Sequence, residues 1–454
     1  MNNKIANKLK KKKRILILGG FGYGNVGDEA QVSATINELK NRYPDYIITV
    51  LTPNEGYTYN EHNKCNLNEA PRIAFYDQDR NKLHNLYSIN NKNKKSVKHY
   101  IANEVYKIRF VLRFFWIYIN SFLINANLPT FFLSARRVSL LYEISKSDII
   151  YYSGGGYLTG KTLTRLWDGV FFVKIANVFK KPVVFSGQTI GVWETRINRI
   201  LAKWAFKDVK AITLRDPEDS INSLNEIGLS GENIFVTCDD ALFCEKIDDK
   251  IVIDRYLMNS GLKEEDIEKG YVTLNIHYWG IETEKGKKEM LSKINNIVNV
   301  IKDNCQYNIL LIPMTPSDEK TINEYIENYY DERVYKFEYD YNFRVIRGII
   351  SRSKICVTMK HHPIIFSIGE KVPVISLSFS NYYEHKNIGA LKLFGLEKFN
   401  VKLEKEDYLS SFKTLFTETL NNKDRIIENL DNEFEKIKIK KEKFFDYVEK
   451  YLEK

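Results

Sequence analysis

Short apolar runs, each followed by glycine or polar residues and then by a helical pattern, recur along most of the chain. Runs bounded by turn-forming residues in this way are typical of strands that are buried on both faces. Because a helix separates each strand from the next, the order predicts parallel, doubly wound sheets of the α/β class. The predicted strands are residues 14–18, 46–51, 149–152, 183–185, 211–214, 234–237, 272–276, 309–312, 355–359 and 372–377.

The pattern changes near the middle of the chain. After Leu242 the stretch Lys246–Lys269 is charged and helical, and a second series of strands and helices starts at Val272. At 454 residues the chain is also too long for one ordinary domain. We therefore expect two Rossmann-like domains that face each other across a cleft. The predicted parts are a basic N-terminal tail (1–13), an N-terminal domain (14–245) with an insertion near 54–140, a C-terminal domain (246–403) and a C-terminal helical segment (404–454).

The insertion contains two different kinds of sequence. Residues 54–99 are polar and poor in periodicity, which predicts an irregular stretch, whereas Ile108–Leu133 is rich in aromatic residues but interrupted by arginine, asparagine and proline. A transmembrane helix needs about 20 consecutive apolar residues, so these interruptions argue against a membrane span. Two interpretations stay open: a buried helix of the first domain, or an interfacial helix that rests on a membrane and is flanked by Arg136 and Arg137.

The net charge of +10 is unevenly distributed, with a basic run at Lys8–Arg14 and a stretch rich in Lys and Glu at Glu435–Lys454. Such runs are usually solvated faces or tails. The alternative is attraction to an anionic lipid surface or to a polyanionic substrate. No nucleic-acid-binding motif accompanies the charge, so nucleic acid is not an expected partner.

The cysteines and the N-terminal sequence indicate in which cellular compartment the protein is expected. Five cysteines are irregularly spaced and form no CxxC pair, so we expect neither a metal site nor a disulfide framework. The N-terminal stretch lacks a small-residue cleavage site, so no signal peptide is expected. These features predict a cytoplasmic protein, with the inner face of the membrane as the alternative place of action.

Three glycine-rich stretches follow predicted strands: GGFGYGNVGDEA (19–30), SGGGYLTG (153–160) and SGQTIG (186–191). Glycine lets a backbone turn tightly and approach a ligand closely, although glycines at such turns can also be purely structural. Open α/β sheets bind ligands at the carboxyl ends of their strands. The candidate binding residues in these stretches are therefore Gly24, Asn25, Gly155, Gly156 and Gln188.

The stretch Lys354–Leu377 combines a strand, a polar cluster and the start of a helix. Its apolar run ends at Lys360, His361 and His362, and Pro363 follows where the first turn of a helix tolerates proline. The pKa of a histidine lies near neutrality, which suits proton transfer. The sequence therefore predicts chemistry at the carboxyl end of this strand.

Taken in order, these stretches resemble the polysaccharide pyruvyl transferase family. The resemblance implies a GT-B-like two-domain fold and a transferase that moves the enolpyruvyl unit of phosphoenolpyruvate onto a sugar as a ketal. It implies phosphoenolpyruvate as donor substrate, no other cofactor, and as acceptor a sugar of a cell-surface polysaccharide or its lipid-linked oligosaccharide precursor. The matching pieces are GGFGYGNVGDEA, YSGGGYLTG, SGQTIG, LRDPEDS (214–220), CDDALF (238–243) and MKHHPIIFSIGEKVPVISLSFSNYYEHKNIG (359–389).

By position, the resemblance implies a catalytic role for His362 and anion binding by Lys360 and Arg215. This chain reads Lys–His–His where the family has Arg–Leu–His. The difference matters because lysine binds an anion as a point charge, whereas arginine binds it bidentately. His361 is expected to be structural or to support its neighbour. A salt bridge with Asp216 or with Glu218 is the alternative role for Arg215.

Three further candidates for substrate binding follow other predicted strands. His277 and Trp279 lie after the strand at 272–276, and Trp279 is expected either to stack on a sugar or to pack in the core. Lys386 is expected either to contact the acceptor or the donor phosphate, or to belong to an exposed polar loop.

Two other functions stay open. A GT-B-type glycosyltransferase with a nucleotide-sugar donor would have the same two-domain layout. A non-catalytic assembly protein at the membrane surface would use Ile108–Leu133 and the basic ends of the chain.

Overall fold

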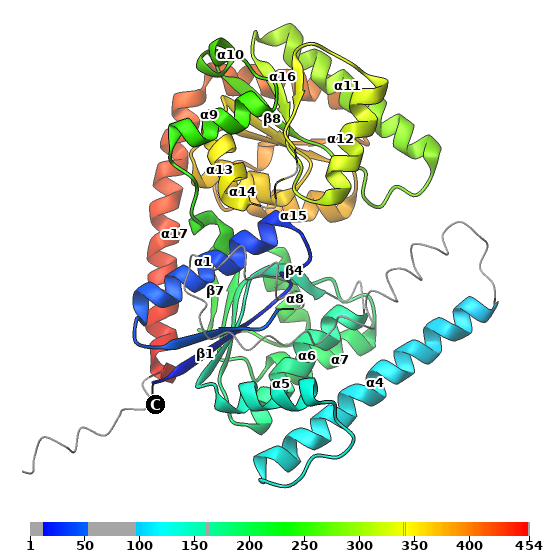
Figure 1. Ribbon diagram of the computed structural model, residues 1–454, viewed down its shortest axis with the longest axis vertical. Coiled ribbons are helices and arrows are strands. Elements are labelled where there is room, and N and C mark those ends of the chain that lie inside the picture. Colours follow the sequence, from blue (N-terminus) through cyan, green and yellow to red (C-terminus); the bar gives the residue numbers. More distant parts are fainter. Residues whose placement is uncertain (1–11, 53–96, 160–162, 339, 341, 453–454) are drawn as a thin grey trace, which may run out of the picture.

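The computed structural model describes residues 12–52, 97–159, 163–338, 340 and 342–452. Residues 1–11 of the predicted basic tail and most of the predicted irregular stretch 54–99 lie outside this range. The described residues form two parallel α/β sheets, one in each half of the chain (Figure 1). The predicted doubly wound α/β class is therefore confirmed.

The first half of the chain builds one sheet and its covering helices. In the described residues its strands lie in the order β2-β1-β3-β5-β6-β7, with β4 paired to β5, and the pairings are parallel. The elements are β1 (Arg14–Leu18), α1 (Val26–Arg42), β2 (Ile47–Val50), α4 (Val97–Asn125), α5 (Ala135–Lys146), β3 (Ile149–Tyr152), β4 (Gly155–Thr159), α6 (Leu163–Val178), β5 (Val183–Gly191), α7 (Arg196–Phe206), β6 (Ala211–Leu214), α8 (Asp219–Glu226), β7 (Ile234–Val236) and the short helical turn η2 (Asp240–Phe243).

The second half builds the other sheet, with the strand order β10-β9-β8-β11-β12-β13 in the described residues. Its edge strands β10 and β13 were not predicted, because each has only three residues, too few to show a periodicity. The elements are α9 (Lys250–Asn259), α10 (Glu264–Lys269), β8 (Tyr271–Asn275), α11 (Glu284–Asn304), β9 (Asn308–Leu311), α12 (Pro316–Asn328), β10 (Val334–Lys336), α13 (Phe343–Ser351), β11 (Ile355–Thr358), α14 (His361–Gly369), β12 (Val374–Ser378), α15 (Asn381–Lys392), the short turn η3 (Glu397–Phe399), β13 (Asn400–Lys402), α16 (Tyr408–Asn421) and α17 (Lys423–Leu452).

Each sheet has a point where the order of its strands reverses. This switch point lies between β1 and β3 in the first sheet and between β8 and β11 in the second. Ligands of open α/β sheets bind at the carboxyl ends of the strands at such a point. Because α1 follows β1 and α14 follows β11, the N-terminus of each helix starts at a switch point.

Two predicted glycine turns are strands in the structure. Gly155–Thr159 forms β4, and residues 186–191 extend β5 as far as Gly191, because these two segments pair in parallel. Gly187 has a φ of 55°, in the region where the register between β5 and β6 shifts. The glycine is thus part of an irregularity within a strand, which a single sequence does not distinguish from a turn.

The two halves share apolar contacts. Val26 and Ala30 of α1 belong to the same buried cluster as the core of the second half. In the opposite direction, Phe444 and Val448 of α17 pack with Ile17 of β1 in a buried cluster of the first half. Helix α17 therefore runs along both halves, as the red helix in Figure 1 shows.

Helix α4 is buried on one side only. Phe114 and Ile117 are buried, and the ring centroid of Phe114 lies 5.1 Å from that of Trp167 in α6. Ile108 and Leu112 on another side are exposed. Among the described residues no helix has the length and apolarity that crossing a bilayer requires. The buried interpretation is confirmed for one side of the helix, and the interfacial interpretation stays a prediction for the other.

Candidate functional site

The N-termini of α1 and α14 meet between the two sheets. Helix α1 begins after Asn25, whose Oδ1 accepts a hydrogen bond from the Gly27 N–H at 3.1 Å. The Val26 N–H donates to the carbonyl oxygen of Met314 in the second half at 3.1 Å. A Cβ added to Gly27 would lie 1.9 Å from the His362 ring, so only glycine permits this approach. The positive ends of two helix dipoles thus lie close together.

His361 and His362 form the first turn of α14. The helix starts at His361 rather than at Pro363, and the proline fits because first-turn amides need no partner within the helix. Both imidazoles are buried, with their ring centroids 5.4 Å apart. Among the described residues, neither Nδ1 of His361 nor Nε2 of His362 has a hydrogen-bond partner. Each imidazole thus has one buried ring nitrogen without a partner among the described residues.

A buried carboxylate, Asp239, joins the two halves. Its Oδ2 accepts hydrogen bonds from Nη1 of Arg215 at 2.6 Å and from Nε2 of Gln31 at 2.7 Å, and it lies 3.1 Å from Nε2 of His361. Its Oδ1 accepts a hydrogen bond from the Ala241 N–H at 2.9 Å. The partners come from α1, from the end of β6, from η2 and from α14, so one side chain fixes four elements.

Burial and this ion pair set the protonation of the site. Burial opposes a charge on Asp239, but Arg215 and the hydrogen bond to His361 hold the pKa of its carboxyl well below the usual range. Burial, together with the charge of Arg215, lowers the pKa of His361 to about 3. Burial also lowers the pKa of His362 well below its ordinary value. Both imidazoles are therefore neutral at pH 7.

His362 lies near two carboxylates but is bonded to neither. Its Nε2 is 3.9 Å from Oδ2 of Asp239 and 4.0 Å from Oδ1 of Asp28, beyond hydrogen-bond distance. The ring is held instead by packing against Gly27.

Arg215 is buried with one guanidinium nitrogen unused. Its Nη1 binds Asp239, and its Nε donates to Oγ1 of Thr189 at 2.7 Å. Its Nη2 has no hydrogen-bond partner among the described residues. A Cβ added to Gly156 would lie 2.8 Å from this Nη2 and 3.9 Å from Nζ of Lys386. Two cations, one from each half, therefore lie beside the Gly156 backbone.

The alternative pairings of Arg215 with Asp216 and with Glu218 are wrong, since Arg215 pairs with Asp239 and Glu218 pairs with Lys392. Asp216 instead accepts a hydrogen bond from the Ser220 N–H at 2.7 Å and so holds the start of α8. The two neighbours in sequence point to different partners because Arg215 follows a strand at the sheet edge that faces α14.

Lys360 makes its contacts within the second half. Its Nζ lies 2.6 Å from Oδ1 of the buried Asp318 and donates to Oγ1 of Thr315 at 2.9 Å. The Lys360 ammonium group is thus paired with a carboxylate that is fully buried from solvent. Anion binding by Lys360 stays a prediction.

The glycine-rich stretches shape the first half of the site. Gly24 has a φ of 77°, a conformation that glycine adopts without strain. A Cβ added to Gly155 would lie 1.9 Å from the ring of Tyr157, so this glycine makes room for an aromatic side chain. Gln188 is buried, and its Nε2 donates to three backbone carbonyl oxygens, including that of Ser153 at 2.7 Å. This use of the glutamine amide is structural.

His277 is buried and Trp279 is not. Nδ1 of His277 accepts a hydrogen bond from the Trp279 N–H at 3.2 Å, and its ring centroid lies 4.7 Å from that of Tyr383. Burial and the charge of Lys360 lower the pKa of His277 to about 3. The Trp279 side chain is 61% exposed, so the core-packing interpretation of this residue is wrong.

The structure brings Arg215, Lys386, His361 and His362 to one place and adds two residues that were not predicted, Gln31 and Asp239. Asp239 belongs to CDDALF, directly after a predicted strand, and that position was the available signal. Gln31 lies within α1, and nothing in the pattern distinguishes it from a surface glutamine. Among the described residues, no three His, Cys, Asp or Glu side chains gather as a metal site would require.

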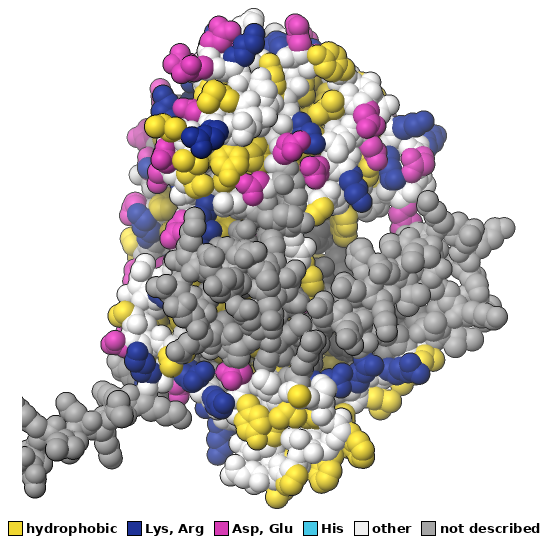
Figure 2. Space-filling view, in the orientation of Figure 1, with side chains coloured by type: hydrophobic (Ala, Val, Ile, Leu, Met, Phe, Trp, Pro, Cys, Tyr) yellow, Lys and Arg dark blue, Asp and Glu magenta, His cyan; other side chains and the backbone are white. Residues whose placement is uncertain are grey.

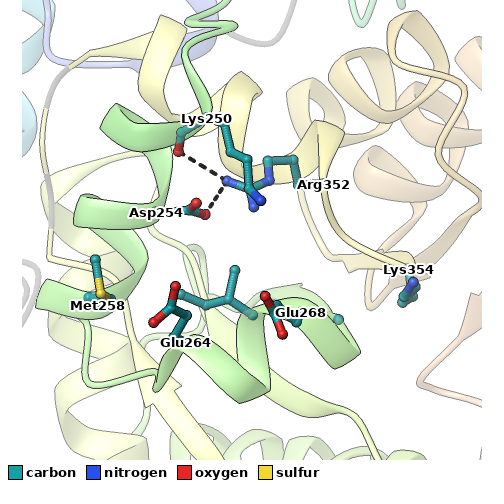
Figure 3. A pocket seen from close by; sticks show the side chains of 9 residues that line it. Lys250, Asp254, Met258, Glu264, Glu268, Arg352 and Lys354 are labelled. Carbon is teal, nitrogen blue, oxygen red and sulfur yellow. Dashed lines mark hydrogen bonds and ion pairs between the residues drawn. The ribbon is translucent and has the colours of Figure 1, made fainter.

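A separate pocket of about 420 Å³ lies at the opposite edge of the second sheet (Figure 3). Gly270 and Lys354, which precede β8 and β11, are among its lining residues. Inside it Arg352 pairs with Asp254 at 2.5 Å and donates to the Lys250 carbonyl oxygen at 3.4 Å. The pocket is thus at the amino ends of the strands, where ligands of this fold class do not bind, and we assign it no role.

Stability is expected to fall as the pH drops below about 6.5, because His277, His361 and His362 are neutral in the folded protein but take up protons in the unfolded chain. Each such histidine is expected to lower the free energy of unfolding by about 1.4 kcal/mol for each pH unit below pH 6.5. Burial raises the pKa of Asp240 to about 6, so below this pH its carboxyl takes up a proton in the folded protein but not in the unfolded chain. This proton uptake has the opposite effect on stability and cancels the contribution of one of the three histidines. Urea unfolding at pH 7 and at pH 5.5 measures the net slope.

The contribution of one histidine can be isolated with His277→Asn, whose amide oxygen can still accept the Trp279 N–H. The slope of unfolding free energy against pH is expected to fall by about 1.4 kcal/mol per pH unit in this variant. His385→Gln, which changes an exposed histidine, is the control. Equal slopes in the wild type and in His277→Asn would contradict the assignment.

Known proteins were compared with the chain as a whole. The family model described as polysaccharide pyruvyl transferase matches residues 25–381. No curated relative matches the chain. Among solved structures, the fold is similar to a UDP-N-acetylglucosamine 2-epimerase, with 13% identity, a TM-score of 0.54 and coverage of 98% of this chain and 97% of that chain.

Two further structures have a similar fold. A putative UDP-N-acetylglucosamine 2-epimerase from Listeria monocytogenes has 10% identity and a TM-score of 0.53, covering 92% of this chain and 90% of that chain. The glycotransferase of kitacinnamycin has 8% identity and a TM-score of 0.50, covering 97% and 100% of the two chains. At such identities the likeness shows the fold alone, and it confirms the GT-B-like architecture. Since the family model spans most of the chain, the protein is a transferase that belongs to the polysaccharide pyruvyl transferase family.

Proposed function

We propose that the protein transfers the pyruvyl unit of phosphoenolpyruvate to a sugar as a cyclic ketal, with release of phosphate. The observation that carries this proposal is the unused Nη2 of Arg215 beside Lys386 and the Gly156 backbone. Phosphoenolpyruvate holds a phosphate and a carboxylate close together. Two cations next to helix N-termini suit such a compact polyanion, because charge-assisted hydrogen bonds and helix dipoles both favour it.

His362 is the proposed proton carrier. Since burial keeps its imidazole neutral, it can take the proton of the attacking sugar hydroxyl and return a proton to the methylene carbon of the donor. The sugar oxygen then bonds to the central carbon, and the methylene becomes a methyl group. A second hydroxyl displaces phosphate, which leaves with that hydroxyl's proton. Lys386 and Arg215 hold the phosphate in this scheme.

The acceptor is proposed to be a sugar of a cell-surface polysaccharide or of its lipid-linked precursor. Family membership supports a sugar or polysaccharide acceptor. Trp279 offers an exposed indole on the second half of the chain, where a sugar ring can stack.

Thermal unfolding with phosphoenolpyruvate, and separately with UDP-N-acetylglucosamine, tests the donor. Phosphoenolpyruvate at a hundredfold excess over its Kd is expected to stabilise the protein by about 2.7 kcal/mol. Lys386→Gln is expected to raise this Kd tenfold or more, because about 1.5–3 kcal/mol of a charge-assisted bond is lost. Lys392→Gln is the matched control, since this lysine lies on the same helix and pairs with Glu218.

Stabilisation by the nucleotide sugar alone would favour the glycosyltransferase alternative. Stabilisation by phosphoenolpyruvate that Lys386→Gln leaves unchanged would keep the donor but refute its placement beside Gly156.

A further inference from the structure

Helix α4 carries an exposed apolar stripe. Ile108, Leu112, Phe115, Ile119 and Phe122 are each between 46% and 62% exposed. Their spacing of three or four residues places them on one side of the helix. A continuous stripe of large, solvent-exposed apolar side chains is unusual on the surface of a soluble protein. Such patches mark sites where a protein binds another surface.

The stripe belongs to a well-packed helix. On the other side of α4, Phe114 packs edge-on against Trp167 and Phe171, with ring centroids 5.1 and 5.4 Å away. Ile117 and Ile124 are buried on the same side. Helix α4 therefore needs no further partner to fold against the first half, and its stripe is left facing outward.

The loop after α4 extends the apolar surface. The Trp116 indole N–H donates to the Phe131 carbonyl oxygen at 3.1 Å, and the Phe131 N–H donates to Oδ1 of Asn120 at 2.8 Å. These bonds fold the loop back along the helix. They leave Phe132 93% exposed and with a φ of 51°, a conformation that residues other than glycine rarely adopt.

The stripe lies next to positive charge. Residues 105–142 include Lys107, Arg109, Arg113, Arg136 and Arg137 but no aspartate or glutamate. The exposed Arg109 and Arg113 lie at one edge of the stripe, and Figure 2 shows dark blue side chains along this helix with yellow ones below them. Burial and the nearby Arg113 lower the pKa of Arg137, so these two cations lie close enough to interact.

We propose that α4 and the loop at 126–134 dock on the surface of a bilayer that contains anionic lipids. In this arrangement the apolar stripe and Phe132 enter the boundary between headgroups and acyl chains, and the arginines at the edge bind lipid phosphates. An amphipathic helix with large apolar side chains and a cationic edge is the usual form of such an interfacial contact.

Co-flotation of the full chain with vesicles tests the proposal independently of the donor. The probes are vesicles of phosphatidylcholine alone and of phosphatidylcholine with about a quarter phosphatidylglycerol. The protein is expected to float with the anionic vesicles and to be released by high salt. The triple variant Leu112→Gln, Phe115→Gln, Phe132→Ser is expected to bind at least about tenfold more weakly, because each side chain loses apolar burial.

Matched variants distinguish membrane docking by α4 from nonspecific hydrophobic binding to vesicles and from dimerisation through α4. Ile251→Gln with Tyr330→Gln removes equally exposed apolar side chains from the second half and is expected to keep binding. Arg109→Gln with Arg113→Gln is expected to lose the preference for anionic vesicles. Binding to neither vesicle overturns the proposal. So does a dimer in light scattering that the triple variant converts to a monomer without any vesicle binding.

Discussion

Replacing His362 with alanine is expected to lower kcat by about 10²–10⁴-fold, the usual contribution of a positioned proton carrier. The Kd for phosphoenolpyruvate is expected to change by less than about threefold, since the proposed anion contacts come from Arg215 and Lys386. The imidazole is neutral in the empty site, so the acid limb of kcat/KM in the wild type is expected below pH 6.5. Initial-rate kinetics by phosphate release, with donor titration by calorimetry, measures all three quantities.

A structural role for His362 would give a different result. Because its ring packs against Gly27, alanine leaves a space between α1 and α14. His362→Asn, which keeps a polar side chain of similar reach, is therefore compared with alanine for activity and for melting temperature. Recovery of turnover in the asparagine variant, or unchanged turnover in the alanine variant, would refute the proton-transfer role.

Replacing Asp239 with asparagine is expected to destabilise the protein by about 3–5 kcal/mol, the cost of breaking a buried ion pair on one side. Arg215 is 1% exposed and would keep its charge with no carboxylate beside it. Asparagine keeps only one side-chain oxygen, so either Gln31 Nε2 or the Ala241 N–H would lose its acceptor. Urea unfolding measures the loss, and Asp248→Asn is the matched control because its carboxylate is 80% exposed.

The double variant Asp239→Asn with Arg215→Gln sharpens this test. Removal of both charges is expected to cost less than the sum of the single changes, because no uncompensated charge is left buried. If the loss of unfolding free energy in the double variant equals the sum of the two single losses, the two side chains do not act as a pair. Donor binding is expected to weaken in every variant that removes Arg215.

The sequence predicted the sheets better than it predicted the site. Strands such as Ile149–Tyr152 are signalled by their own residues, since burial on both faces requires a continuous apolar run. The Lys–His–His cluster was predicted for the same reason: it ends such a run. A local pattern does not show which strand ends of the first sheet lie next to which strand ends of the second.

The contacts around Asp239 illustrate that gap. Its bond to Gln31 joins residues 208 positions apart, and its contact with His361 joins residues 122 positions apart. Neither pairing leaves a periodic trace in one sequence, because each depends on how α1 and α14 approach each other. The same reason explains Lys360, whose partner Asp318 lies in another helix of the second half.

The packing of α17 has a consequence for how the chain folds during its synthesis. Lys441 on this helix pairs with Glu38 of α1 at 3.0 Å, and the two residues are 403 positions apart. The part of the first sheet that α17 covers, where Phe444 packs against Phe235 of β7, is therefore open on the ribosome until α17 has emerged. During that interval Phe235 lacks its native partners Phe444 and Tyr447, and its exposed ring is open to contacts with other apolar surfaces.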